Sequence, residues 1–345
     1  MKMPRLLSNS LKLLVTLVLL FLVLNSVDIS KIGRDLKTFS GKTLILLVVL
    51  CWAGQLLCSE RWRIFAASLQ MRGTYRSFVQ MYFAGMFFNI GLPSLVGGDA
   101  VKAYVLSRKT NKSIQSGLAS VLQDRAAGFI SLLAYGSICI VVHPISWRGI
   151  PLWYLYAALW AAIAFFLWLI FKGDRFYRGF LKPGHQSILQ KALRRTADFH
   201  KSLAMSSLKP GAAARVVLYS FLYSGVVLWI FQQVTAAAGH EVGIVPFSAL
   251  FPMITIGTML PLTLGGIGIR EWLYIEALAL VGIPGDQALV ISLATSALYL
   301  LSNSAGLLFL PAIPAELRSQ TFDFPENTSS NDAARHRIPP RNDVI

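Results

Sequence analysis

The chain has 345 residues, of which 55% are hydrophobic and only 14% are charged. Soluble domains carry about 25% charged residues, so this composition excludes an ordinary soluble protein. Apolar stretches recur along the whole chain, and a membrane helix needs roughly 20 mostly apolar residues. Because backbone polar groups in lipid must be satisfied within the segment, we expect an all-α, polytopic helical bundle in the membrane.

The formal net charge of +16 would point to nucleic acid in a soluble protein. Here the basic residues lie between apolar runs, as in proteins that follow the positive-inside rule and contact anionic lipid. We therefore expect membrane lipids as partners and no nucleic acid. The sequence has no Walker loop, Ser-His-Asp arrangement or metal-ligand spacing. We expect no catalytic residue, no metal and no cofactor.

Nine apolar segments follow one another along the chain: 11–27, 43–58, 78–92, 116–142, 150–171, 212–238, 247–260, 268–282 and 286–312. The first follows a basic start but lacks a small-residue cleavage site, so we interpret it as an uncleaved membrane helix. Two short segments, 78–92 and 247–260, run into breaks that contain Pro and Gly-Gly. If 78–107 and 247–282 each enter and leave on one side, six full crossings remain.

Charge between the segments predicts the orientation. The segment 172–215 carries ten Lys and Arg against two Asp, whereas 239–246 carries no Lys or Arg. This contrast places the connection 172–210 in the cytoplasm, as an interfacial helix or a plain linker helix, and both termini with it. We expect an inner (plasma) membrane protein with a transmembrane domain at 1–315. The polar tail 316–345 is expected to be disordered.

Two breaks share one pattern, L-P-x-x-x-G-G-x-x-x-[K/R]. It spans Leu92 to Lys102, with Pro93, Gly97 and Gly98, and Leu260 to Arg270, with Pro261, Gly265 and Gly266. We predict an internal repeat, about 43–142 and 212–312, in inverted orientation, a common plan of transporters. Each second helix would begin inside the membrane and offer free N–H groups to a phosphate, with Lys102 and Arg270 in one cavity. The alternative is a helix kink packed by small residues.

Charged residues at membrane depth cost at least a few kcal/mol each, which makes them candidate site residues. They are Asp99, Lys102, Asp124, Arg125, Arg270 and Glu271. Adjacent residues on a helix do not face each other, so each neighbouring pair is expected to bond elsewhere. Asp99 and Glu271 would orient the cations or exchange protons. For Asp124 and Arg125 a structural salt bridge is an equal alternative.

Three motifs together resemble the lysylphosphatidylglycerol synthase transmembrane (flippase-like) family over roughly residues 10–312: Pro93-x3-Gly97-Gly98-Asp99-Ala100-Val101-Lys102-Ala103, Asp124-Arg125-Ala126-Ala127-Gly128 and Pro261-x3-Gly265-Gly266-Ile267-Gly268-Ile269-Arg270-Glu271. Larger members of this family carry a cytosolic aminoacyl-transferase domain, which we do not expect here. Lys102 stands where the motif usually carries arginine, so a point charge replaces a bidentate fork.

The resemblance implies a membrane lipid flippase or lipid-handling transporter that acts on an anionic, polyprenyl-linked or hopanoid-type lipid. We expect Lys102, Arg270 and Arg125 to bind an anionic headgroup, and we expect no enzyme activity. One alternative is a non-transporting scaffold that presents lipid to a partner lipid-modifying enzyme. A second is an intramembrane enzyme that acts on lipid headgroups.

Overall fold

The computed structural model describes residues 40–91, 97–180, 197, 199, 201–203, 208–259 and 268–312. Several predictions lie outside these residues: the first helix at 11–27, Pro93, the break with Pro261, Gly265 and Gly266, most of the 172–210 connection beyond 180, and the 316–345 tail. For residues 171–180 the structure describes the helix but not the side chains.

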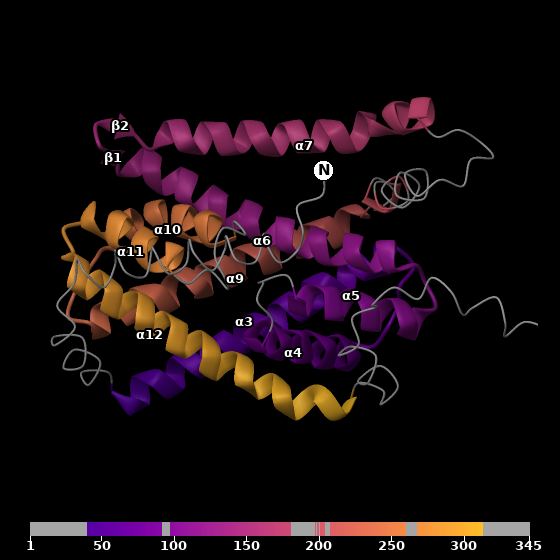
Figure 1. Ribbon diagram of the computed structural model, residues 1–345, viewed down its shortest axis with the longest axis horizontal. Coiled ribbons are helices and arrows are strands. Elements are labelled where there is room, and N and C mark those ends of the chain that lie inside the picture. The colour runs from indigo at the N-terminus through magenta and orange to yellow at the C-terminus, as the bar shows by residue number, and fades with distance from the viewer. Residues whose placement is uncertain are drawn as a thin grey trace, which may run out of the picture.

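The described part of the chain is almost entirely helical, as predicted (Figure 1). Its elements are α3 Gly41–Ser68, α4 Tyr75–Gly91, α5 Gly97–Thr110, α6 Ile114–Val142, β1 Ser146–Trp147, β2 Ile150–Pro151, α7 Trp153–Phe180, α9 Pro210–Ala237, α10 Ile244–Met259, α11 Ile269–Ala279, α12 Gly285–Ser304 and the 3-10 helix η3 Ala305–Ala312. The two short strands pair with each other in an antiparallel turn between α6 and α7.

Five described helices are long and apolar enough to cross a membrane. They are Gly41–Ser68, Ile114–Val142, Trp153–Ile170, Pro210–Ala237 and Gly285–Leu310. A helix of 28 residues, such as α3, is about 42 Å long, more than the ~30 Å hydrocarbon core. These five correspond to five of the six predicted crossings, so the chain is a multi-pass membrane protein.

The first broken unit is an antiparallel helical hairpin. Pairs of contacting residues on α4 and α5 run in opposite directions: Gly85 packs against Lys102, and the Asn89 side chain accepts a hydrogen bond from the Gly98 N–H at 2.8 Å. With 17 residues, α4 is about 25 Å long, too short to cross the core. The chain therefore enters and leaves at one end of the bundle.

The second broken unit has the same form. Gly257 of α10 packs against Leu273 of α11, and Met253 and Ala277 line the same hollow further along, so the two helices are antiparallel. The two units occupy different ends of the bundle (Figure 1). The backbone of Ala103 in α5 packs on Gly117 near the start of α6, whereas α11 bonds to Trp147, after the end of α6. The inverted repeat itself stays a prediction.

Among the described residues, two large clusters of buried apolar side chains form the core, and a small third one holds Ile64, Phe65 and Val216. One large cluster lies mainly among α6, α9, α10, α11 and α12, and the other mainly among α3, α4 and α5. Helix α6 contributes to both, with Leu133 in the first and Val121 in the second. The boundary between the clusters crosses the middle of the bundle, where the polar residues described below gather.

Helix α7 lies along the edge of the bundle in Figure 1. Its large side chains, such as Phe165, Phe166 and Trp168, are exposed, as expected for a helix that lies in lipid. The helix ends at Phe180, nine residues beyond the predicted end of the apolar segment at 171. The start of the basic connection is therefore a continuation of a membrane helix.

Candidate functional site

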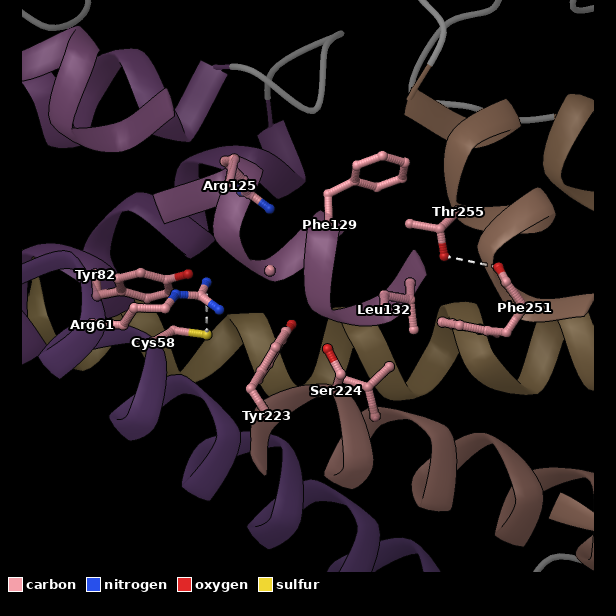
Figure 2. A pocket seen from close by; sticks show the side chains of 12 residues that line it. Cys58, Arg61, Tyr82, Arg125, Phe129, Leu132, Tyr223, Ser224, Phe251 and Thr255 are labelled. Atoms are coloured by element: carbon pink, nitrogen blue, oxygen red, sulfur yellow. Dashed lines mark hydrogen bonds between the residues drawn. The ribbon is translucent and has the colours of Figure 1, made fainter. Parts of the chain in front are cut away.

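A cavity of about 220 Å³ lies between the two apolar clusters. We call it the central cavity (Figure 2). Side chains from five helices line it, namely α3, α4, α6, α9 and α10: Cys58, Arg61, Tyr82, Arg125, Gly128, Phe129, Leu132, Tyr223, Ser224, Val227, Phe251 and Thr255. It brings two guanidinium groups together inside an apolar bundle.

The first guanidinium is that of Arg61 on α3. Its side chain is 3% exposed, and Nε donates to Asp124 Oδ1 at 2.6 Å. Nη1 donates to the Ser220 hydroxyl at 3.2 Å, and Nη2 lies 3.7 Å from the Cys58 sulfur. A methyl group on Gly128 would lie only 3.1 Å from Nη2, so this glycine of α6 leaves the space that the guanidinium fills. Arg61 therefore joins α3, α6 and α9.

The second guanidinium belongs to Arg125, one residue after Asp124. Its Nε and Nη2 donate to the two carboxylate oxygens of Asp99 at 2.8 and 3.1 Å, a bidentate pair. Its side chain is 39% exposed, so it stays accessible from the cavity. Asp99 Oδ1 also lies 2.7 Å from Lys102 Nζ. The Asp99 carboxylate on α5 thus forms ion pairs with both Arg125 and Lys102.

Lys102 is buried, with a side chain only 2% exposed. Its ammonium group lies over the ring of Tyr82 at 4.1 Å and near that of Trp62 at 5.6 Å. Such cation–π contacts compensate part of the hydration that a buried ammonium loses. Lys102 is not among the described residues that line the central cavity, and its ammonium group pairs with Asp99, which reaches toward Arg125.

The charges around the cavity do not cancel. Arg61, Lys102 and Arg125 supply three positive charges, and Asp99 and Asp124 supply two negative charges. Within the described residues this cluster keeps one positive charge. Unpaired charge in an apolar bundle is costly, so this surplus needs a compensating partner. The hydroxyl groups of the cavity, from Tyr223, Ser224 and Thr255, add hydrogen-bonding capacity.

The other predicted cation, Arg270, lies on α11 at the opposite end of the bundle from α5 (Figure 1). Its Nε donates to Glu271 Oε1 at 3.1 Å. Neither Lys102 nor Arg270 lines the central cavity. A cavity shared by these two residues therefore stays a prediction, which the lining of the central cavity does not support, because each described hairpin carries its own basic residue at its own end.

The expected free N–H groups are also partly used within the fold. The Gly98 N–H, at the start of α5, donates to Asn89. The Gly268 N–H, just before α11, donates to Glu271 Oε2 at 2.6 Å, so this glutamate caps its own helix. Gly98 serves another purpose, since a methyl group there would collide with the backbone carbonyl of Gly85. It permits the close approach of α4 and α5.

The expectation that adjacent charges bond elsewhere is confirmed for one pair and wrong for the other. Asp124 bonds to Arg61 and Arg125 to Asp99. Arg270 and Glu271, in contrast, pair with each other, because both lie in the first turn of α11, where side chains can bend toward the helix start. Glu276 accepts from the Trp147 indole at 3.0 Å and so ties α11 to the β1–β2 turn.

Arg61 is a cavity residue that was not predicted from the sequence. The apolar run ends at Cys58, so Ser59 to Arg63 resembled the start of a loop, whereas α3 continues to Ser68. The missed signal is periodic: Cys58, Trp62, Phe65 and Ala66 continue one apolar helix face beyond the run. Arg61 follows Cys58 by three residues and precedes Phe65 by four, so it shares that buried face.

The chain matches the family described as "Lysylphosphatidylglycerol synthase TM region" over residues 9–305. It belongs to this family. One relative is a "UPF0104 membrane protein" of Methanothermobacter thermautotrophicus (strain Delta H), 24% identical over 260 residues, which cover 69% of this chain and 75% of the relative. No solved structure matches the chain. The matched region includes every described residue of the central cavity.

Proposed function

We propose that the protein is a lipid flippase or lipid-handling transporter whose central cavity receives an anionic lipid headgroup. The observation that carries this proposal is the accessible guanidinium of Arg125 beside that of Arg61, in a cavity between apolar helices. Arginine binds phosphate through two parallel hydrogen bonds, which makes it well suited to a phosphate-containing headgroup. The one surplus positive charge of the cluster supports the same ligand class.

The lining of the cavity supports a headgroup rather than a whole lipid. The central cavity has a volume of about 220 Å³, and its lining carries the Arg61 and Arg125 guanidinium groups, which suit a phosphate group better than a hydrocarbon chain. The chains of the lipid therefore stay outside the central cavity. Membership of a family named for a lipid synthase membrane region agrees with a lipid as the ligand.

Reversible binding follows from the pairing of Arg125. Without ligand, Asp99 occupies the donors of Arg125, and Lys102 holds Asp99 from the other side. A headgroup phosphate competes with Asp99 for these donors, and Asp99 retains Lys102 when it is displaced. The site thus binds an anion and releases it without leaving a carboxylate unpaired. Arg270, 25% exposed on α11, is a further proposed contact at the opposite end of the lipid path.

Replacement of Arg125 by Gln is expected to weaken binding of anionic lipid by about ten-fold to over a hundred-fold, the value of one charge-assisted hydrogen bond. Asp99 keeps Lys102 in this variant, so the fold is expected to persist. The measurement is binding of phosphatidylglycerol to the purified protein in phosphatidylcholine nanodiscs. Native mass spectrometry of the co-purified lipids identifies the natural ligand.

The matched control is Arg63→Gln. Arg63 lies on α3 two residues after Arg61, but it pairs with Glu60 of its own helix and does not line the central cavity. The Arg63→Gln variant is expected to bind lipid with the affinity of the parent protein. Equal affinity of Arg125→Gln, Arg63→Gln and the parent would place the headgroup site elsewhere.

A transport assay distinguishes the proposed flippase from the two alternatives, a scaffold and an intramembrane enzyme. A flippase moves fluorescent phosphatidylglycerol between the leaflets of vesicles that contain only the purified protein. A scaffold binds the lipid without moving it and requires a partner lipid-modifying enzyme. An intramembrane enzyme changes the lipid chemically, which mass spectrometry of the recovered lipid detects. We propose that the protein is not an enzyme.

We further propose that the protein lies in the inner (plasma) membrane with its basic connection at 172–210 in the cytoplasm. In a chain whose own three cysteines are replaced by Ser, His185→Cys is expected to be shielded from an impermeant thiol reagent in intact cells, and His240→Cys to react. The physical reason is the excess of Lys and Arg around 185 and their absence at 239–246. The opposite labelling would reverse the orientation.

A further inference from the structure

A second hollow adjoins the central cavity. It measures about 140 Å³ and lies between α3, α9 and α12, and we call it the side groove. Tyr223 and Val227 line both spaces, so they form the partition between them. The groove begins where the central cavity ends.

The course of the groove follows from the residue numbers on two helices. On α3 the groove residues Leu50 to Gln55 precede the cavity residue Cys58. On α9, which runs antiparallel and packs Tyr223 against Gly54, the groove residues continue from Tyr223 to Val234. Eleven helical steps span about 16 Å, close to half of the ~30 Å hydrocarbon core. The groove is as deep as one leaflet.

The walls of the two spaces differ in chemistry. Two arginines face the central cavity, whereas the side groove has no charged residue among its described lining. Its walls are mainly apolar, with Leu50, Val226, Ile230 and Leu298 among them, and Gln55 and Thr295 add two uncharged polar groups. A polar cavity that opens beside an apolar groove matches the two parts of an amphiphile.

Tyr223 suits the partition. A methyl group on Gly54 would lie 3.3 Å from its ring, so the ring packs closely on α3. The Arg61 guanidinium carbon lies 5.6 Å from the ring centroid. The hydroxyl group points into the central cavity (Figure 2). The ring thus offers an apolar surface to the groove and a polar group to a ligand in the cavity.

We infer that the side groove holds one hydrocarbon chain of the lipid whose headgroup occupies the central cavity, with Tyr223 at the junction. This inference rests on the proposed function. The groove has a volume of about 140 Å³ and extends about 16 Å along α9, a length that suits part of one chain. Lipid chains are as apolar as the groove walls, so the groove contributes affinity by close packing and not by removing the chain from water.

The test uses two substitutions, one on α9 and one on α3, and each makes the groove narrower. Val226→Phe on α9 and Leu50→Phe on α3 add side-chain volume to the groove walls, and neither residue lines the central cavity. The matched controls are Val217→Phe on α9 and Leu46→Phe on α3, where the side chains are 55% and 50% exposed to lipid. Thermal melting identifies the variants that fold, and Arg125→Gln serves as the variant of the headgroup site.

Two probes are titrated into each purified protein: dipalmitoyl phosphatidylglycerol, and glycerol phosphate, which has the headgroup phosphate and no chain. Each groove variant is expected to weaken binding of the lipid by about ten-fold, a common effect of overfilling a packed site. Its affinity for glycerol phosphate is expected to stay unchanged, as is that of both controls for both probes.

The outcomes distinguish the two proposals. If Arg125→Gln leaves both probes bound as in the parent, the headgroup site of the proposed function fails. If Arg125→Gln weakens both probes but the folded groove variants bind the lipid normally, the chain site is overturned. Equal weakening of lipid and glycerol phosphate by the groove variants also overturns it, because the change has then reached the central cavity.

Discussion

A methyl group at position 98 is expected to separate α4 from α5. A side chain on Gly98 would collide with the backbone carbonyl of Gly85 and would lie 2.6 Å from the Asn89 side chain. A backbone atom cannot rotate away as a flexible side chain can, so the hairpin must open. Overfilling a packed site usually costs about 1–3 kcal/mol, and we expect Gly98→Ala at the upper end of this range.

The effect reaches the candidate site because α5 carries Asp99 and Lys102. A shift of α5 moves Asp99 away from Arg125, so lipid binding is expected to fall together with the melting temperature. The matched control is Gly225→Ala in α9, where the added methyl group would meet only the Tyr135 hydroxyl, at 3.4 Å. Equal melting temperatures for the two variants would contradict the close packing of α4 on α5.

The membrane helices could be predicted from the sequence for a physical reason. In lipid, a crossing needs a long apolar run with its backbone bonds satisfied inside the helix, so length and hydropathy decide the fold class. The short runs were also informative. Segments 78–92 and 247–260 are too short to cross and precede Gly-Gly breaks, and each belongs to a helical hairpin.

The partners of the buried charges could not be predicted. Arg61 and Asp124 are 63 positions apart, and Arg125 and Asp99 are 26 apart. No local periodicity specifies these pairs, because they depend on which faces of α3, α5 and α6 meet. The identity of Asp124 and Arg125 as candidate site residues was nevertheless available, since a charged pair inside an apolar run is rarely without a role.

The location of the cavity could not be predicted from the sequence pattern either. The two L-P-x-x-x-G-G motifs are alike, which suggested that Lys102 and Arg270 meet in one place. A motif specifies a local turn and leaves open the end of the bundle to which its hairpin returns. The residues that do meet, Arg61 and Arg125, belong to long helices outside these motifs.

Replacement of Asp124 by Leu is expected to lower the free energy of unfolding by about 3–5 kcal/mol, because it leaves the buried guanidinium of Arg61 without its carboxylate. The double variant Arg61→Met/Asp124→Leu is expected to regain most of this loss. Well-packed apolar residues often replace a buried ion pair without cost. Melting temperatures of the parent, both single variants and the double variant form a cycle that measures the coupling of the two residues.

The same cycle separates stability from binding. The second oxygen of Asp124, Oδ2, is buried without a hydrogen-bond partner among the described residues, so the pair is not fully satisfied as a structural bridge. Since such pairs add little net stability, we expect that Arg61 is retained for its place in the central cavity. The double variant should then fold like the parent and still bind phosphatidylglycerol at least about ten-fold more weakly, the value of one lost charge-assisted hydrogen bond. A double variant that recovers both the fold and the affinity would reduce Arg61 and Asp124 to a structural bridge and leave Arg125 as the headgroup cation of this cavity.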